Sequence, residues 1–216
     1  MRARDPVRLI EACRWRGAVS MKAGPWTLRT QPITNPYDAA FLGMMLGEPY
    51  TMLTRPARSS LAPYEEGVCE HPDVVMEDSR RELRRHLPIL LAARGQVLIT
   101  GLGMGCVLRG LLSLPEVESV DVVEIDGAIL DLVAEEFARD PRVRIHHGDA
   151  LTLKWCPDAR WDYAWHDIWC EGPGLNGLHL QLLERFCNRC PRQGAWTLPR
   201  EAKRLLRRRL SWEVIG

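Results

Sequence analysis

The stretch VLITGLGMGCVLRG, residues 97–110, passes from strand-forming residues through three alternating glycines into a helical segment. Gly101, Gly103 and Gly105 form the pattern G-x-G-x-G. A phosphate-binding P-loop would continue into Gly-Lys-Ser/Thr, and the dinucleotide fingerprint G-x-G-x-x-G would need glycine at position 106, which is Cys106. The loop is therefore expected to bring its backbone close to a ligand, but it carries neither the P-loop signature nor the dinucleotide signature.

Helix and strand patterns alternate on both sides of this loop. This alternation predicts an α/β fold with a doubly wound, mostly parallel sheet covered on both faces. The expected helices are 78–95, 106–114, 127–140, 176–190 and 200–210, and the expected strands are 96–100, 117–126, 143–149, 161–167 and 194–199. Ligands of such sheets bind outside the carboxyl ends of the strands. That edge holds residues 101–105, 124–126, 149–150 and 167–171.

The first 75 residues have a different texture. They are rich in proline and contain short β-like runs at 26–30 and 50–55. This predicts a small β-rich N-terminal element or lid over residues 1–75, followed by the doubly wound domain over residues 76–216. The Arg-rich start, residues 1–17, is interpreted as a surface helix or frayed tail because it lacks an apolar signal core.

Composition narrows the class of protein. The chain has 216 residues, a net charge of +1 and 46% hydrophobic residues, which is ordinary for a soluble globular protein. No apolar run is long enough for a membrane span, so no membrane partner is expected. Seven scattered cysteines argue against a disulfide framework and for a cytoplasmic location. Cys187 and Cys190 are interpreted as helix-end cysteines, and no metal is expected.

Three acidic residues stand at the ends of successive predicted strands. Glu124 follows Gly101 by 23 residues and is well placed to accept hydrogen bonds from both hydroxyls of a ribose. Asp149 ends the next strand, where it could accept a bond from an adenine amino group. Asp167 ends the fourth strand. Each signal is weak alone, but with the glycine loop the three acids favour a nucleoside site.

These segments carry a resemblance to a known family. RRHLPILL, VLITGLGMG, VESVDVVEIDGAILDLV, PRVRIHHGDAL and WDYAWHD resemble, in order and spacing, S-adenosylmethionine-dependent methyltransferases with a Rossmann-like fold, and within them the spermidine synthase-like branch. The resemblance implies S-adenosylmethionine as the cofactor. It implies that residues 101–105, with Gly101, Leu102, Gly103 and Gly105, cradle the methionine part. Glu124, followed by Ile125, would hold the ribose, and Asp149 with Ala150 would flank the adenine.

The sequence departs from that branch where polyamine chemistry needs charge. The aspartate of the family's glycine loop is replaced by Met104, its Tyr-His pair by Arg80-Arg81, and its second acid after the catalytic aspartate by Cys170. A polycationic substrate needs several carboxylates, and of these only Asp167 is kept. We therefore favour a methyltransferase with an unidentified acceptor. An aminopropyltransferase and a non-catalytic cofactor- or nucleic-acid-binding module remain the alternatives.

Asp167 is the candidate catalytic residue, as a base or as a group that orients an amine. An equally good interpretation is that it only contacts the cofactor or caps the next segment. His166 should point to the opposite face and is interpreted as a core histidine. Period two places Trp161, Tyr163 and Trp165 together on one face of the strand. Trp169 could wall the acceptor pocket, and Glu171 in the adjacent loop could supply a second polar group.

The macromolecular partners are less constrained. Residues 200–210 hold six cations and one anion, a pattern that could track nucleic-acid phosphates. We favour the simpler interpretation, the last helix of the sheet with Leu206 and Leu210 directed inward. Nucleic acid is thus an open but not a favoured partner, and a homodimer is left open.

Overall fold

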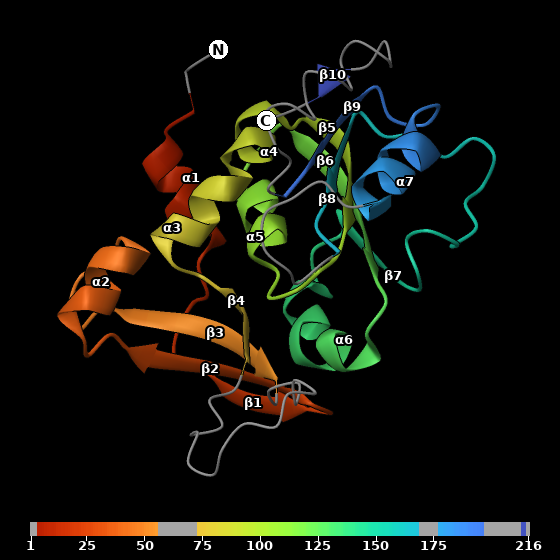
Figure 1. Cartoon of the computed structure of the whole chain (residues 1–216). Helices are drawn as coiled ribbons and strands as arrows, with labels where there is room; N and C mark the ends of the chain where they lie inside the picture. The colour runs from red at the N-terminus through yellow and green to blue at the C-terminus, as the bar shows by residue number, and fades with distance from the viewer. Residues whose placement is uncertain (1–3, 56–72, 169–176, 197–212, 215–216) are drawn as a thin grey trace.

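The computed structural model describes residues 4–55, 73–168, 177–196 and 213–214. The predictions for Trp169, Cys170, Glu171 and the helix at 200–210 lie outside these residues. Within them, two separate sheets carry the fold (Figure 1). No helix in the described part of the chain is long and apolar enough to cross a membrane.

The larger sheet is parallel throughout and has the strand order β10-β9-β8-β5-β6-β7. The chain runs outward from β5 to β6 and β7, then returns to the other side of β5 with β8 and β9. This reversal makes the sheet doubly wound, as the sequence predicted. The strands are β5 (Gly95–Thr100), β6 (Val117–Glu124), β7 (Val143–His147), β8 (Tyr163–His166), β9 (Arg192–Ala195) and β10 (Glu213–Val214).

Helices cover both faces of this sheet because its strands are apolar on both faces. On one face Val97 and Ile99 pack with buried residues of α4 (Leu87–Ala92), α5 (Cys106–Leu112) and α6 (Gly127–Val133). On the other face Leu98 and Ala164 pack against α7 (Gly177–Phe186). Figure 1 shows α4 and α5 on the side of the sheet opposite to α7.

The N-terminal residues form a sheet of their own. Its strands β1 (Ser20–Ala23), β2 (Trp26–Pro32), β3 (Pro49–Arg55) and β4 (Asp73–Glu77) are antiparallel and follow in chain order. The helix α2 (Pro36–Leu42) connects β2 to β3. The predicted domain boundary after residue 75 falls inside β4. Helix α6, which packs on the parallel sheet, contacts β1 and β2. The N-terminal sheet therefore docks on the larger sheet through α6 (Figure 1).

The Arg-rich start of the chain forms helix α1 (Pro6–Cys13), capped by the Asp5 side chain. One face of α1 is buried, with Leu9, Ile10 and Cys13 in the core cluster that also contains α5. The surface helix expected from the sequence therefore exists, and it packs on the larger sheet's helical layer.

The predicted helix at 78–95 is divided. It consists of α3 (Arg80–Leu83), a 3₁₀ turn η1 (Arg84–His86) and α4, with Ser79 as the cap of α3. Pro88 lies in the first turn of α4, where its missing N–H is tolerated, so a new helix begins there. Gly95 begins β5 with a φ of 65° and does not end the helix.

The prediction that Trp161, Tyr163 and Trp165 share a face is wrong for Trp161. Strand β8 begins only at Tyr163, so the alternation does not extend back to Trp161. Trp161 packs on the α7 side, edge-on to Phe186, and its indole N–H donates to Asp121 Oδ2 at 2.9 Å. Tyr163 and Trp165 lie in the core cluster on the other face.

Candidate functional site

A cavity of about 410 Å³ opens at the carboxyl ends of the parallel strands. It lies where the strand order reverses between β5 and β8, the position at which doubly wound sheets bind ligands. Seven residues singled out from the sequence line it: Gly101, Gly103, Glu124, Ile125, Asp149, Ala150 and Asp167. The structure therefore brings together one site from four separate strand ends.

Leu102 and Gly105, the other two predicted cofactor contacts, are not among the lining residues. Leu102 is buried, and its backbone N–H donates to Glu124 Oε2 at 2.8 Å. Gly105 begins α5 with a φ of 74°, and a Cβ there would lie 2.7 Å from the Phe137 ring. Both residues shape the loop from behind its ligand-facing side.

The glycine loop is also required by the protein's own packing. Gly101 has a φ of 93°, and a Cβ on it would lie 1.8 Å from the backbone oxygen of Asp167. A Cβ on Gly103 would lie 2.8 Å from Met76 Sδ. The absence of side chains thus lets the loop touch the end of β8 on one side and the N-terminal sheet on the other.

Glu124 is held rigidly at the end of β6 and is only 8% exposed. Its Oε2 accepts from Leu102 N, and its Oε1 accepts from Asp126 N at 2.9 Å. A carboxylate has about four acceptor positions, so two backbone bonds leave capacity for a ligand's hydroxyl groups. The carboxylate is therefore oriented before any ligand arrives.

The residues predicted to surround the adenine differ in exposure. Asp149 fixes the turn after β7 by accepting from Leu151 N at 2.8 Å. Ala150 is buried in the cavity wall, whereas Ile125 is 64% exposed at the rim. Both side chains are apolar, so this part of the cavity lining suits an apolar group of a ligand.

Asp167 is half-buried just past β8, and its backbone N–H donates to Thr100 O at 2.8 Å. Burial raises the pKa of its carboxyl to about 8, with further contributions from the nearby carboxylates of Glu82 and Glu124. At neutral pH this carboxyl is therefore largely protonated, unlike an ordinary aspartate.

Sequence reasoning missed Glu82, which does not line the cavity but affects the pKa of Asp167. It lies on α3, and its two oxygens accept from Trp196 Nε1 and Arg85 Nη1, each at 2.7 Å. The available signal was an acid on the helix preceding the first parallel strand, but sequence spacing does not show which neighbour such an acid faces. The negative charge of Glu82 contributes to the raised pKa of Asp167, which lines the cavity.

The N-terminal sheet supplies the wall of the cavity that the sequence did not predict. Trp26, Leu53, Val75 and Met76 all line it. Trp26 Nε1 donates to Asp126 Oδ2 at 2.7 Å, next to the Glu124 strand end. No local pattern marks these four residues, because they reach the cavity only through the docking of one sheet on the other.

The interpretation of Arg80 and Arg81 as cations at a polyamine position is wrong. Arg80 pairs with Glu48 at 2.8 Å and Glu11 at 2.9 Å. The Arg81 guanidinium lies 3.7 Å from the centre of the Phe41 ring. Neither residue lines the cavity, because α3 turns this face toward α1 and α2.

His166 is a buried core residue, as predicted. Its Nδ1 is 3.0 Å from Thr100 Oγ1, its Nε2 is 3.1 Å from Gln193 Oε1, and its ring stacks on Phe186. Both ring nitrogens therefore have partners away from the cavity, so the residue does not serve the site directly.

Cys187 and Cys190 are free thiols at the end of α7. Cys190 is buried, which raises the pKa of its thiol to about 12. Among the described residues no group of three or more His, Cys, Asp or Glu side chains is arranged to hold a metal ion.

The chain is similar to proteins of known activity across this region. Residues 77–168 match the family model of the spermine/spermidine synthase domain. The chain is 34% identical over 94 residues to spermine synthase of Arabidopsis thaliana, across 40% of this chain and 26% of the relative. It is 31% identical over 122 residues to polyamine aminopropyltransferase 1 of Pseudomonas aeruginosa, across 52% of this chain and 42% of the relative.

A methyltransferase is among the relatives as well. The chain is 36% identical over 79 residues to putrescine N-methyltransferase 4 of Nicotiana tabacum, across 33% of this chain and 20% of the relative. The chain thus carries a spermidine synthase-like region and spans less than half the length of each of these three relatives.

Proposed function

We propose that the protein is an S-adenosylmethionine-dependent methyltransferase whose acceptor is an amine. The observation that carries the proposal is the buried Glu124 carboxylate, which faces a cavity bounded by the glycine loop and by apolar side chains. The similarity to both putrescine N-methyltransferases and aminopropyltransferases supports a donor of the adenosyl sulfonium class.

The residues present fit such a donor. Glu124 would accept from the ribose hydroxyls, Asp149 from the adenine amino group, and Ile125 with Ala150 would hold the ring between them. S-adenosylmethionine supplies a methyl group on a positively charged sulfur, which leaves as a neutral thioether when a nucleophile takes the methyl group. The charged sulfonium is compatible with a site whose ionisable lining residues, in the described part of the chain, are all acidic.

Asp167 would act on the acceptor. An amine that becomes methylated gains a positive charge and must release a proton, and the Asp167 carboxylate can take it. A base works best when its pKa lies near the operating pH, and burial brings the pKa of Asp167 to about 8. Because Asp167 is held at the end of β8, it would also orient the acceptor nitrogen. Holding two reacting groups in the correct geometry accounts for a large part of the rate enhancement in such transfers.

Aminopropyl transfer is the second candidate. The family match over residues 77–168 and the matches to spermine synthase and to the Pseudomonas enzyme favour it. The same carboxylates, Asp167 with Glu82 behind it, would serve an amine acceptor in either reaction. The loss of the glycine-loop acid to the fully buried Met104 favours methyl transfer.

Calorimetric titration with S-adenosylmethionine, its demethylated product and the decarboxylated form separates the two. Methyl transfer predicts micromolar binding of the first two and weaker binding of the third. Incubation with labelled S-adenosylmethionine and a panel of mono- and diamines, followed by mass spectrometry, should then show a product heavier by one methyl group. A preference for the decarboxylated form would establish the second candidate. Binding of none of the three would refute both.

A further inference from the structure

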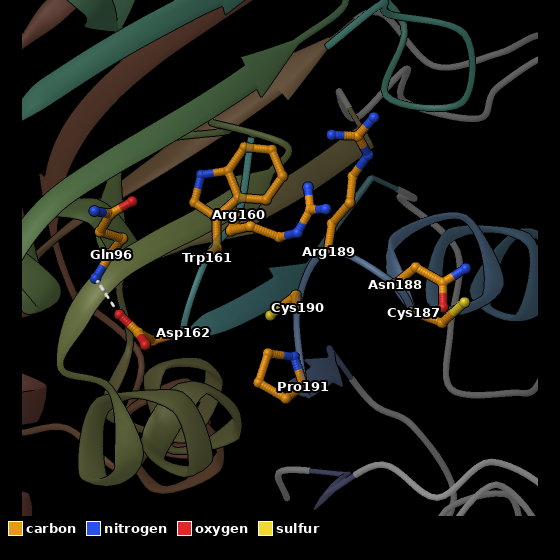
Figure 2. A pocket seen from close by; sticks show the side chains of 9 residues that line it. All are labelled: Gln96, Arg160, Trp161, Asp162, Cys187, Asn188, Arg189, Cys190 and Pro191. Carbon is orange, nitrogen blue, oxygen red and sulfur yellow. Dashed lines mark hydrogen bonds between the residues drawn. The ribbon is translucent and has the colours of Figure 1, made fainter. Parts of the chain in front are cut away.

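Two adjoining cavities lie between the loop that precedes β8 and the carboxyl-terminal end of α7. One has a volume of about 420 Å³ and is lined in part by Arg160, Asp162 and Arg189 (Figure 2). The other, of about 470 Å³, is lined in part by Lys154, Arg185 and Arg189. They share Arg189 and contain none of the residues that line the candidate site.

Two guanidinium groups are held together at the first cavity. Arg189 Nη1 donates to the backbone oxygen of Ala159 at 3.1 Å, and Arg160 Nη1 donates to the same oxygen at 2.9 Å. Both also donate to Pro157 O, at 3.4 and 2.8 Å. Figure 2 shows the two groups side by side. Like charges held this close repel each other, and a bound anion would offset that repulsion.

Two buried polar donors belong to residues that line the second cavity. Arg185 donates through Nη2 to Leu153 O, whereas its Nε is buried without a partner. The indole nitrogen of Trp155, another lining residue, is also buried without a partner. Among the described residues, this cavity is lined by three cations and no carboxylate. A bound anion would offset the repulsion among these cations.

The four cations also lack counter-ions. Within the described residues, Lys154, Arg160, Arg185 and Arg189 have no carboxylate within 4.0 Å, whereas Arg142 and Arg144 each pair with an aspartate at 2.8 Å. Asp162, the one acid among the described residues that line the first cavity, accepts from Gln96 N at 2.9 Å (Figure 2). Backbone carbonyls fix the arginines in place while most of each guanidinium's five donors stay available.

We propose that these two cavities form a phosphate-binding site, with Arg185 and Arg189 as its fixed centre and Arg160 and Lys154 at its rim. Guanidinium groups match the oxygens of a phosphate by paired hydrogen bonds, and groups already fixed by the protein lose little entropy on binding. The ligand is a phosphate mono- or diester, carried by a small molecule or by a nucleic-acid backbone. The site does not depend on the function proposed for the other cavity.

The test measures binding of inorganic pyrophosphate by calorimetry and of a short labelled single-stranded RNA by fluorescence anisotropy, both at low salt. The wild type is compared with the double variant Arg185→Gln/Arg189→Gln, with the exposed rim variant Arg160→Gln, and with Arg139→Gln as a matched control. Arg139 is an exposed arginine on the far side of the sheet that lines neither cavity. Thermal unfolding of each variant reports whether it is folded.

We expect the double variant to weaken binding at least about tenfold, equivalent to about 1.4 kcal/mol, and Arg160→Gln to weaken it severalfold. The control should bind as the wild type does.

RNA is expected to bind far more tightly than pyrophosphate if the ligand is a phosphodiester backbone. In that case the slope of log affinity against log salt concentration should also become smaller by about one for each arginine removed. Comparable binding of both probes indicates a small phosphorylated ligand. The proposal is overturned if the wild type binds neither probe, or if the folded double variant binds as well as the wild type.

Discussion

Trp26 and Asp126 are 100 residues apart in the sequence, yet the indole N–H of Trp26 donates to Asp126 Oδ2 at 2.7 Å. Trp26 belongs to the N-terminal sheet, and Asp126 begins α6 directly after the Glu124 strand end. Both residues line the same cavity. The bond therefore joins the N-terminal sheet to the part of the site that is proposed to hold the ribose.

This bond should be measurable as a coupling between the two residues. Trp26→Phe removes the donor while keeping an aromatic ring, and Asp126→Asn removes the charge while keeping an oxygen for the helix cap. A double-mutant cycle on urea unfolding should give a coupling energy of about 1.5–3 kcal/mol, as expected for a hydrogen bond to a charged group. Strictly additive effects would show that the bond contributes nothing to docking of the sheets.

Glu124 should control affinity for the cofactor. Glu124→Ala removes an acceptor whose orientation is fixed by two backbone bonds, so the Kd for S-adenosylmethionine should rise at least about tenfold. Glu124→Gln keeps one acceptor oxygen, so its Kd should lie between those of the wild type and Glu124→Ala. Glu118→Gln is the matched control, because Glu118 is an exposed glutamate at the other end of β6. Equal affinity of Glu124→Ala and the wild type would disprove the assigned role.

The pKa of Asp167 predicts the pH dependence of the reaction. A base acts in its deprotonated form, so the rate should rise with pH and level off above the pKa of about 8. Asp167→Asn cannot take a proton, and it should lower kcat by about 10²-fold and remove this limb of the profile. If Asp167→Asn keeps the wild-type profile at reduced rate, Asp167 orients the acceptor and a different group takes the proton.

Gly101 should be the least replaceable glycine of the loop. Gly101→Ala forces a side chain into a φ of 93° and places its Cβ 1.8 Å from the Asp167 carbonyl. We expect the free energy of unfolding to fall by more than about 3 kcal/mol. Gly17 has a similar φ of 81° but no atom within 4 Å of such a Cβ, so Gly17→Ala should cost only about 1 kcal/mol. Equal costs would mean that the loop can move away from β8.

Arg109 should be a main determinant of stability behind the glycine loop. Its Nη2 donates to Met104 O at 2.7 Å, its Nη1 to Cys13 O at 3.1 Å, and its Nε to Glu136 Oε1 at 2.6 Å. Arg109→Met leaves the buried backbone oxygens of Met104 and Cys13 without this donor and should destabilise the fold by about 3 kcal/mol in chemical denaturation. The exposed Arg139, changed to Met, should cost less than about 0.5 kcal/mol.

Short-range patterns were enough to predict the half of the site that lies on the parallel sheet. The strand, glycine loop and helix around Gly101 are contiguous, and the acids at 124, 149 and 167 mark strand ends that a parallel sheet brings to one edge. The packing partners of the loop were not predictable, because Phe137 and Met76 approach it only in the folded chain.

The remaining wall could not be derived from the sequence, since Trp26, Leu53 and Met76 belong to a sheet with no local signal of where it docks. Trp161 shows the same limit at smaller scale. A strand that begins two residues later than expected moves its ring to the opposite side of the sheet.

The central position of β5 has a consequence for how the protein is made. Strand β5 pairs with β6 on one side and with β8 on the other. A chain emerging from the ribosome can pair β5 with β6 and β7 early, which assembles the glycine loop and Glu124. Strand β8, and Asp167 directly after it, can pair with β5 only after the 62 residues between Thr100 and Tyr163 have been synthesised. Asp167 can therefore join the lining of the cavity only after the glycine loop and Glu124 have been synthesised.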